Sequence, residues 1–362
     1  MTMKKSLFED APEIKPVPLS KGMTISDFIH TIGQTSFEAR NVYRGARLFK
    51  RMIDDGNVIW LGIAGAGIVG GMGGMVISLL KTGFIDVICS TGAQVYHDLH
   101  FAFGLPVKGI RLHYDDNVLR QHGDTRIYDI GIREQETLKA QDKIICRFVK
   151  DQHEMLSERS LSSWEINYHL GHWINKTAKY PERSFVATAA KLGVPIFWDS
   201  MSNHSLAMNL LRMDLEGYPL FLSGQKDIYD SAAIAYASTH TGFVELGGGG
   251  PKNFIQQTGP TLNQIMGIDF EGADYGIQIS TAIEKDGSLS GCTLSEGITW
   301  GKYHSADEDR LVQIWGEYSI IFPLLSVYVL EQCENRSIKN IISQLPLFIE
   351  QLKKNVKIQP RR

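Results

Sequence analysis

Apolar residues near the start of the chain recur with the period of two amphipathic helices. The first helical pattern begins at Thr24 and the second covers residues 37–54, and each places its apolar side chains on one face. A turn signal at residues 55–57 precedes an unbroken apolar run at residues 58–64. Such a run is typical of a strand that is buried on both faces of a parallel sheet.

Strand and helix patterns then alternate along most of the chain. Further strands are predicted at residues 86–90, 194–198, 241–246 and 275–280, and helices at residues 95–103, 184–192, 229–238 and 252–266. This alternation indicates an α/β fold with a doubly wound, mostly parallel sheet and helices on both faces. Residues 106–165 are more charged and less periodic, and are interpreted as an excursion from the sheet.

The same patterns suggest how the chain is divided. We expect an extended N-terminal arm at residues 1–22, a single Rossmann-like domain at residues 23–335, and a C-terminal helix with a basic tail at residues 336–362. No Pro-, Gly- or Ser-rich linker separates two halves of the central region, so one large domain is favoured over two.

The composition is that of an ordinary globular protein. The 362 residues are 43% apolar and 21% charged, with a formal net charge of -3. This mixture excludes a wholly disordered chain, a collagen-like fibre and a small disulfide scaffold. The mild acidity argues against a nucleic-acid-binding protein, which normally carries a basic excess.

The cysteines point to a reducing compartment and to no metal site. Cys89, Cys146, Cys292 and Cys333 lie far apart and form no C-x-x-C pair, so a zinc site is not expected. The N-terminal residues lack an apolar stretch of signal-peptide length. No window approaches the roughly 18 apolar residues of a membrane helix. We therefore expect a cytoplasmic protein without a membrane segment.

The strongest local signal is a glycine-rich segment directly after the first strand. Residues 65–70 read Gly-Ala-Gly-Ile-Val-Gly and fit the G-x-G-x-x-G pattern between a strand and a helix. Such glycines let the backbone and the helix N–H groups approach a pyrophosphate. The acid expected about twenty residues later is Asp86, but it precedes the second strand instead of ending it. A dinucleotide site and simple close packing of helix against strand both remain open.

Two further turns are predicted to lie at the same edge of the sheet. Four glycines follow the strand that ends at Leu246, and residues 90–93 follow the second strand. Ligands of open α/β sheets bind beyond the carboxyl ends of the strands. The three turns are therefore expected to form one shared crevice.

Lys302 is a candidate nucleophile. On an extended segment the side chains of Trp300 and Lys302 would share one face. A neighbouring indole would desolvate the ammonium, lower its pKa and favour Schiff-base chemistry. The alternative interpretation is an ordinary surface lysine.

Several motifs together resemble the deoxyhypusine synthase family. They follow the family's order from about Ile25 to Leu330, and the most specific is Ser295–Lys302, which holds the family's catalytic lysine. The other matching segments are Thr31–Asn41, Ser90–Leu99, Gly247–Gly250, Gly272–Tyr275, Ser280–Ala282, Asp286–Ser288 and Ile321–Leu325.

The resemblance implies an NAD-dependent transferase that assembles as a homotetramer. Enzymes of this family oxidise spermidine with bound NAD and release 1,3-diaminopropane. They hold the remaining aminobutyl unit as an imine on the lysine, here Lys302, and pass it to an acceptor amine. The resemblance assigns substrate contacts to Trp300, Glu296, His97, Asn253 and Gln257. It assigns cofactor contacts to Gly65, Ala66, Gly67, Gly70, Thr91, Gly92, Ala93, Asn203, Gly248, Thr281, Ala282, Asp286 and Glu317. For His97, a proton shuttle near the nicotinamide and a structural histidine are equally open.

The polyamine-binding half departs from the family pattern. Acidic or histidine partners of the family are replaced at Tyr96–His97, Asn203, Met208, Asn253, Gln257 and Leu289. Losing anionic partners for a buried ammonium predicts a changed substrate. This pattern resembles the bacterial deoxyhypusine synthase-like branch, in which the acceptor is a small amine such as putrescine or agmatine instead of a protein lysine. A catalytically lapsed NAD-binding protein used in assembly is the alternative, and the retained Trp300, Lys302 and Glu296 favour the enzyme.

Overall fold

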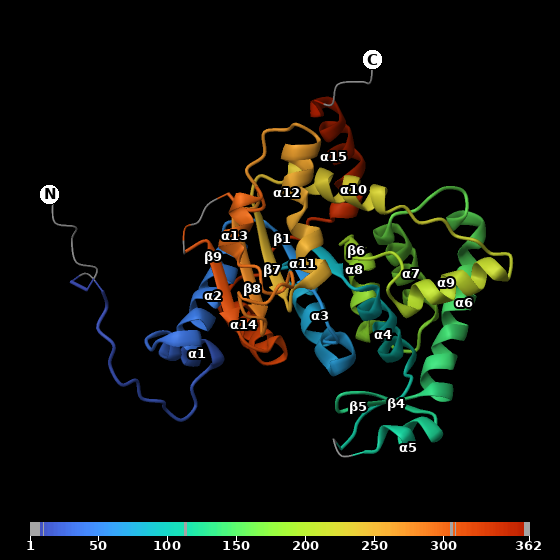
Figure 1. The fold of residues 1–362 in the computed structure, drawn as a ribbon, viewed down its shortest axis with the longest axis horizontal. Helices are drawn as coiled ribbons and strands as arrows, with labels where there is room; N and C mark the ends of the chain where they lie inside the picture. The colour runs from blue at the N-terminus through green and yellow to red at the C-terminus, as the bar shows by residue number, and fades with distance from the viewer. Residues whose placement is uncertain (1–7, 10, 112–113, 305–306, 308, 358–362) are drawn as a thin grey trace.

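A six-stranded parallel β-sheet forms the centre of the molecule, and helices cover both of its faces (Figure 1). The computed structural model describes residues 8–9, 11–111, 114–304, 307 and 309–357. The strands of the sheet are β1 (Val58–Ile63), β2 (Val87–Ser90), β6 (Ile196–Trp198), β7 (Thr241–Leu246), β8 (Tyr275–Ser280) and β9 (Leu311–Trp315). The predicted doubly wound parallel sheet is confirmed.

The strand order β6-β2-β1-β7-β8-β9 reverses its direction of growth beside β1. From β1 the chain first adds β2 on one side, and it later returns to add β7 on the other side. All neighbouring strands pair in parallel, so their carboxyl ends lie at one edge of the sheet. The reversal between β1 and β7 is a topological switch point, where ligands of such sheets bind.

The helices begin and end where the sequence supplies caps. Thr24 and Asp27 form a capping box at the start of α1, and Gly193, with a positive φ, ends α8. None of the helices in the described part of the chain combines the length and apolar character that a bilayer crossing requires. The helices around the sheet are α1 (Ile25–Gly33), α2 (Phe37–Asp54), α3 (Gly73–Lys81), α4 (Gly92–Phe103), α7 (Ser163–Thr177), α8 (Phe185–Leu192), α9 (Ser205–Leu215), α10 (Gly224–Ala237), α11 (Gly249–Gln256), α14 (Tyr318–Gln332) and α15 (Ile341–Asn355).

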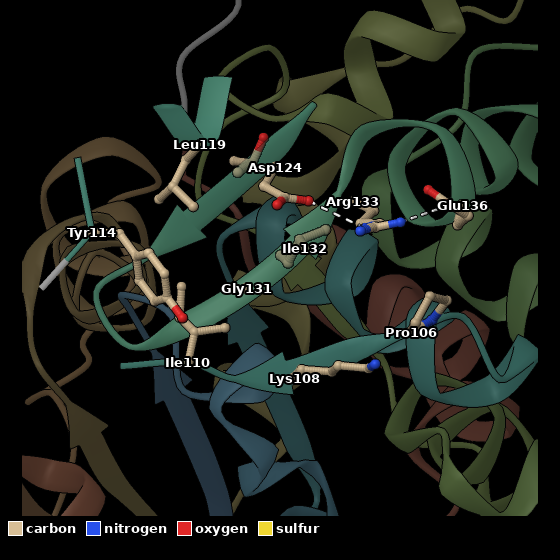
Figure 2. A pocket seen from close by; sticks show the side chains of 11 residues that line it. Pro106, Lys108, Ile110, Tyr114, Leu119, Asp124, Gly131, Ile132, Arg133 and Glu136 are labelled. Carbon is tan, nitrogen blue, oxygen red and sulfur yellow. Dashed lines mark hydrogen bonds and ion pairs between the residues drawn. The ribbon is translucent and has the colours of Figure 1, made fainter. Parts of the chain in front are cut away.

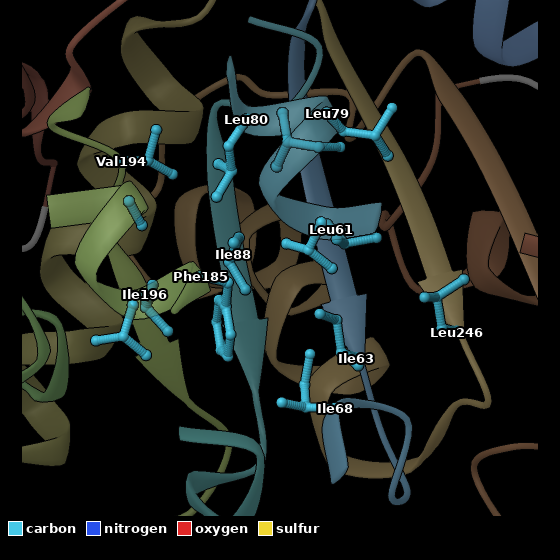
Figure 3. Close-up of a cluster of buried hydrophobic side chains, with 14 of the residues drawn as sticks. Leu61, Ile63, Ile68, Leu79, Leu80, Ile88, Phe185, Val194, Ile196 and Leu246 are labelled. Atoms are coloured by element: carbon cyan, nitrogen blue, oxygen red, sulfur yellow. The ribbon is translucent and has the colours of Figure 1, made fainter. Parts of the chain in front are cut away.

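Both faces of β1 are buried, which explains its unbroken apolar sequence. Leu61 and Ile63 belong to the core that also contains Leu79 of α3 (Figure 3). Trp60 points to the opposite face, where its ring lies 6.3 Å from Phe197 and 6.2 Å from Phe243. Each large apolar side chain buried in this way stabilises the fold by about 1.5–3 kcal/mol.

Residues 106–165 leave the main sheet, as the sequence predicted. Their elements are β3 (Val107–Gly109), α5 (Asp116–Gln121), β4 (Asp124–Ile127), β5 (Ile130–Arg133), the π-helical turn η2 (Glu134–Lys139) and α6 (Ala140–Leu156). The three strands form a small antiparallel sheet in the order β3-β5-β4. A cavity of about 490 Å³ lies beside it, where Arg133 contacts Asp124 at 3.2 Å and Glu136 at 3.2 Å (Figure 2). None of the predicted site residues is among its described lining residues.

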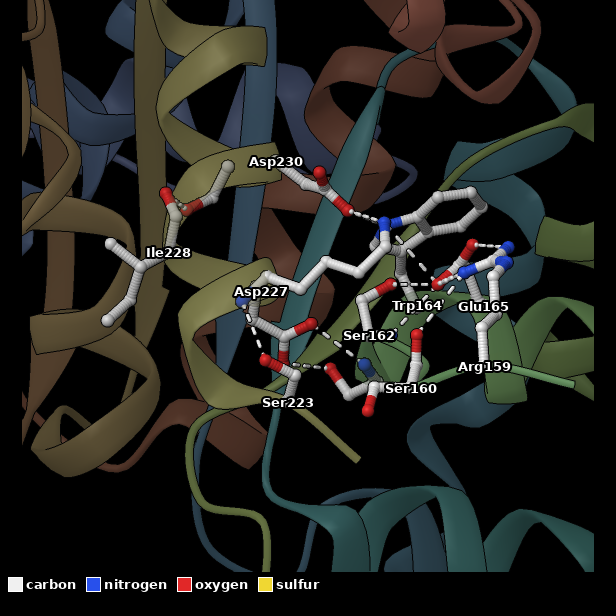
Figure 4. A network of polar contacts seen from close by, with 12 residues as sticks. Arg159, Ser160, Ser162, Trp164, Glu165, Ser223, Asp227, Ile228 and Asp230 are labelled. Atoms are coloured by element: carbon white, nitrogen blue, oxygen red, sulfur yellow. Dashed lines mark hydrogen bonds and ion pairs between the residues drawn. The ribbon is translucent and has the colours of Figure 1, made fainter. Parts of the chain in front are cut away.

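A buried polar network joins α7 to α10 (Figure 4). The backbone N–H and hydroxyl of Ser163 donate to Asp227 at 2.7 and 2.6 Å. Beside this pair, Trp164 Nε1 and Lys226 Nζ both donate to Asp230, at 2.8 and 2.7 Å. Burial raises the pKa of Asp227 to about 7. The network fixes the two helices with every carboxylate in contact with a donor.

Two segments differ from the sequence prediction. The single helix expected at residues 252–266 is divided among α11, α12 (Thr258–Pro260) and the π-helical turn η4 (Thr261–Ile265). Pro260 lies at this division, and proline lacks the N–H that a continuous helix needs. The edge strand β9 is missing from the prediction, because its sequence, Leu-Val-Gln-Ile-Trp, is only partly buried and is not an unbroken apolar run like that of β1.

Candidate active site

A crevice of about 460 Å³ opens at the carboxyl edge of the sheet, beside the switch point. Its walls come from the segments that follow β1, β7, β8 and β9. Its lining residues are Ala64, Gly65, Gly247, Gly248, Gly249, Ser280, Thr281, Ala282, Asp286, Ser288, Ser290, Gly316, Glu317 and Tyr318. The structure therefore brings together six predicted cofactor residues: Gly65, Gly248, Thr281, Ala282, Asp286 and Glu317.

The second glycine cluster shapes this crevice through its backbone. Gly247, Gly248 and Gly249 have φ values of 84°, 134° and 59°, which L side chains rarely adopt. A Cβ atom at Gly248 would lie 2.8 Å from the Cα atom of Ser290. The helix α11 then begins at Gly249, so its first N–H groups lie at the crevice. This combination of bare backbone and helix N-terminus suits a phosphate-bearing ligand.

The first glycine-rich turn is built differently from the expected pattern. The π-helical turn η1 (Ile68–Met72) follows it, and the regular helix α3 begins only at Gly73. The N–H of Ile68 donates to Gln94 Oε1 at 3.0 Å. This N–H group, which the motif would use to bind phosphate, is therefore already hydrogen-bonded to a side chain. The predicted order of strand, glycine-rich turn and helix is present, but the first helical turn is π-helical and is kinked at Gly71, which has a φ of 96°.

Close packing accounts for two of these glycines. The Tyr318 hydroxyl donates to the Ala64 carbonyl at 2.9 Å and lies under the turn. A Cβ atom would approach Tyr318 to 3.0 Å at Gly65 and to 2.9 Å at Gly67. At Gly70 a Cβ atom would meet no atom within 4 Å. Ala66, Gly67 and Gly70 are not among the described lining residues of the crevice.

The acids in the crevice are Asp286 and Glu317, not Asp86. Glu317 caps α14 through the N–H of Ser319 at 2.8 Å, and Asp286 accepts from the N–H of Ser288 at 2.8 Å. Asp86 precedes β2 at the opposite edge of the sheet and accepts from the Ile59 N–H at 2.9 Å. Carboxylates in a nucleotide crevice bind ribose hydroxyls, whereas arginine accommodates an extra phosphate. The crevice therefore offers two carboxylates suited to ribose hydroxyls, and its described lining residues include no Lys or Arg.

The turn after β2 lies outside the described lining of this crevice. Thr91 stands at the N-cap position of α4 without a capping hydrogen bond from its side chain, and Gly92 starts this helix against the ring of His204, which leaves no room for a Cβ atom. Asn203 directly precedes His204 in the chain, and its side chain is exposed. Ala93 is half-buried in the first turn of α4. Thr91, Gly92 and Ala93 thus lie outside the crevice lining but beside the turn after β1, where the Thr91 N–H donates to the Ile63 carbonyl at 3.4 Å and Gln94 Nε2 donates to the Gly65 carbonyl at 2.9 Å.

Lys302 is buried immediately after the short helix α13 (Leu294–Thr299), with 7% of its surface exposed. Its N–H donates to the Gly297 carbonyl at 3.0 Å, and its carbonyl accepts from the Ala273 N–H at 3.0 Å. Gly301, with a φ of 68°, makes the turn that points the chain inward. These contacts exclude the alternative of an ordinary surface lysine.

The Lys302 amine has one hydrogen-bond partner within the described residues, Asn253 Oδ1 of α11 at 3.0 Å. Burial lowers the pKa of Lys302, and the nearby Lys252 ammonium lowers it further. The Cys292 thiol and the Glu245 and Glu296 carboxyls act in the opposite direction. A larger share of neutral amine suits Lys302 to attack an electrophilic carbon.

Trp300 and Lys302 do not share an extended face. Trp300 is the C-cap of α13 and is 63% exposed, so its indole does not bury the Lys302 amine within this chain. Glu296, in the first turn of α13, and Gln257, at the end of α11, also have exposed side chains. Of the five predicted substrate residues, Asn253 is the one that contacts Lys302 among the described residues.

His97 lies on α4 and forms a hydrogen bond of 3.0 Å between its Nδ1 and Nε2 of His100. Burial lowers the pKa of His97 to about 4 and that of His100 to about 3. Both imidazoles are therefore neutral near pH 7. The neutral imidazole of His97 therefore stands on α4 where the family pattern has an acidic side chain.

Sequence reasoning missed the buried polar residues beneath Lys302. Lys252 is 2% exposed and donates to Gln278 Oε1 at 2.9 Å and to the Leu289 carbonyl at 3.2 Å. Glu245 is fully buried and accepts from the Tyr303 hydroxyl at 3.0 Å. An acidic residue inside the apolar strand of residues 241–246 was a readable signal, because buried charges require partners.

One loop connects the two parts of the site. Ser288 and Ser290 line the crevice, and the carbonyls of Leu289 and Cys292 accept hydrogen bonds from Lys252. Lys302 itself is not among the described lining residues. A nucleotide in the crevice would thus lie on one side of this loop, with the buried lysines on the other.

Residues 27–329 match the family model described as "Deoxyhypusine synthase". The chain belongs to the deoxyhypusine synthase family. A "Deoxyhypusine synthase-like protein" from Nostoc punctiforme is 33% identical over 360 residues, which cover 96% of this chain and 91% of that protein. A "Probable deoxyhypusine synthase 2" from Methanosarcina mazei is 32% identical over 331 residues, covering 90% of this chain and 91% of that protein.

The fold of this chain is similar to that of a solved structure. A crystal structure from Entamoeba histolytica that bears the deoxyhypusine synthase name has a TM-score of 0.59 and 16% identity. The alignment covers 90% of this chain and all of that chain. The family match includes every strand of the main sheet and Lys302, and it ends before α15.

Proposed function

We propose that this protein is an NAD-dependent aminobutyl transferase that works through an imine on Lys302. The donor is spermidine or a related polyamine, and the acceptor is a second amine. The observation that carries the proposal is the state of Lys302, which is buried, has its pKa lowered by that burial, and lies in the most specific motif of the family. A lysine held in this way is suited to covalent catalysis.

The crevice supports NAD as the cofactor. Gly248 would approach the pyrophosphate, Thr281 and Ala282 would contact the nucleotide, and Asp286 and Glu317 would accept from ribose hydroxyls. When bound, NAD supplies a hydride acceptor for oxidation of the donor amine and, once reduced, a hydride donor for the final imine.

Lys302 and Asn253 supply the covalent step. The neutral Lys302 amine attacks the carbon of the oxidised donor, a carbon–nitrogen bond to Lys302 forms, and the bond to 1,3-diaminopropane breaks with that amine as leaving group. Asn253 Oδ1 accepts from the attacking amine and fixes its direction. The acceptor amine then displaces Lys302 in the same manner, which returns the lysine to its amine form.

The departures from the family pattern at Met208, Leu289 and His97 favour a small diamine acceptor, putrescine or agmatine, over a protein lysine. Met208 and Leu289 are 68% and 47% exposed, and His97 is held neutral by burial. None of these side chains carries the negative charge that the family pattern has at its position, so we expect substrate use to differ from that of a true deoxyhypusine synthase. A protein lysine as acceptor is an outcome of the test below.

The test is to mix the purified protein with NAD and spermidine, alone or with putrescine, agmatine or a candidate protein acceptor. We expect NADH absorbance, release of 1,3-diaminopropane and, by mass spectrometry, an aminobutylated diamine. Bound NAD without NADH or products under every condition would overturn the proposal in favour of a lapsed NAD-binding assembly protein.

A further inference from the structure

A fully buried carboxyl group lies beneath the reactive lysine. Glu245 stands in β7, a strand whose residues are all buried, and its side chain faces α11 and the segment after α13. Its Oε1 accepts from Gln256 Nε2 at 2.8 Å and from the Tyr303 hydroxyl at 3.0 Å. In the part of the chain that the structure describes, Oε2 has no hydrogen-bond partner.

The two residues that donate hydrogen bonds to Glu245 are close in the chain to the buried lysines Lys252 and Lys302. Tyr303 directly follows Lys302 in the chain, so the backbone that carries the hydroxyl also carries the amine. Gln256 lies on α11 one turn after Lys252. The Glu245 carboxyl is therefore connected to both lysines through short, buried segments.

The two buried lysines differ in their hydrogen bonding. Lys252 donates to three acceptors, Gln278 Oε1 and the carbonyls of Leu289 and Cys292, which matches the three N–H groups of an ammonium. Lys302 donates to Asn253 Oδ1, its one partner among the described residues. Lys252 is thus held by a full set of acceptors, whereas Lys302 has a single acceptor among the described residues.

We propose that Glu245 is a positioning residue that acts through Lys302: its buried carboxylate balances the fixed Lys252 ammonium and so sets the pH at which Lys302 loses its proton. This inference rests on the proposed function, in which Lys302 must be neutral to attack. Gln256 and Tyr303 hold the carboxylate in place and stabilise its charge.

The electrostatics agree with this arrangement. Burial raises the pKa of Glu245 to about 7, and Lys252, Gln256 and Tyr303 oppose that rise. The Glu245 charge in turn raises the pKa of Lys302, against the effects of burial and Lys252. The titratable groups that face the Glu245–Lys302 pair are Lys252, Cys292, Glu296 and Tyr303.

Replacing Glu245 should lower the pKa of Lys302. Glu245→Gln removes the negative charge and keeps an oxygen for both donors, so protonation of Lys302 loses a stabilising partner. The pKa of Lys302 should fall by about one unit, and below that pKa about ten times more of the amine is neutral. Tyr303→Phe removes one donor to the carboxylate and should shift Lys302 in the same direction by a smaller amount.

The experiment measures the Lys302 proton without NAD or polyamine. The folded protein is acetylated with trace acetic anhydride over a pH series, and peptide mass spectrometry reports the reactivity of Lys302. We expect the midpoint to move to lower pH in Glu245→Gln and, less far, in Tyr303→Phe. The matched control is Asp227→Asn, another buried carboxyl whose pKa is raised to about 7 but which contacts Ser163 instead. It should leave the midpoint unchanged.

Unchanged midpoints in both Glu245→Gln and Tyr303→Phe would overturn the inference, as would an equal shift in Asp227→Asn. Because Tyr303→Phe alters only a hydroxyl, it keeps the test decisive if Glu245→Gln does not fold. Transfer activity is measured in parallel. A shifted midpoint without any transfer would support the role of Glu245 while contradicting the proposed function.

Discussion

At the residue scale, Gly248 is the point where the backbone itself shapes the nucleotide crevice. Its φ of 134° and ψ of -132° are accessible to glycine almost alone, and a Cβ atom would lie 2.8 Å from Ser290 Cα. Gly248→Ala should lower the free energy of unfolding by about 1–3 kcal/mol. Displacement of the loop should also weaken NAD binding by roughly tenfold or more.

Urea unfolding and calorimetric titration with NAD measure the two effects. Gly109→Ala in β3, away from the crevice, is the matched control, because a Cβ atom there would meet no atom within 4 Å. The control should leave both quantities unchanged. Wild-type NAD affinity in Gly248→Ala would contradict the assignment of this crevice to the cofactor.

Site residues that belong to a contiguous sequence motif could be predicted from the sequence. Lys302 and Gly248 lie in contiguous segments whose order along the chain carries the family resemblance. Glu245 and Lys252 were missed, because their role depends on contacts between β7, α11 and the segment after α13. Trp300 was misplaced, since a short helix instead of an extended segment precedes Lys302.

At the element scale, Asp86 forms ion pairs that connect the C-terminal segment to the amino edge of the sheet. It is 3% exposed and lies 2.9 Å from Arg336 Nη2 and 3.2 Å from Lys339 Nζ. Asp86→Asn should lower the free energy of unfolding by on the order of 3 kcal/mol, because it leaves two largely buried cations without their anion. Since Asp86 lies at the edge away from the crevice, NAD affinity should stay the same.

Denaturant unfolding and NAD titration of the same variant check this prediction. A large loss of NAD affinity in folded Asp86→Asn would mean that Asp86 binds the ribose, as the spacing from the glycine-rich turn first suggested. Unchanged stability would show that the two ion pairs contribute nothing net.

Helices and strands could be predicted from the sequence where the pattern of apolar residues extended over a long segment. The apolar runs at β1 and β7 predicted buried parallel strands at the right places. The glycine-rich turn after β1 could not be read correctly, because Gln94 and Tyr318 contact it from distant parts of the chain. The strands β3, β4 and β5 were not predicted individually, because they are short, contain charged residues and are mostly not buried.

At the scale of the whole molecule, we predict a homotetramer in which a second copy covers exposed residues near Lys302. Trp300 is 63% exposed and Glu296 is also exposed, although both belong to the motif that ends at Lys302. Size-exclusion chromatography with light scattering should give four times the 40.5 kDa of one chain. A stable monomer at micromolar concentration would contradict this prediction.

The central claim is that Lys302 carries the transferred aminobutyl group. The most direct measurement is reduction with borohydride in the presence of NAD and spermidine, followed by peptide mass spectrometry. We predict an aminobutyl adduct on Lys302 and none on Lys252, which is 2% exposed. Lys302→Arg keeps the positive charge but cannot form an imine, so it should bind NAD and give no adduct. Failure to trap any adduct on wild-type Lys302, or equal labelling of the Lys302→Arg protein, would contradict the account.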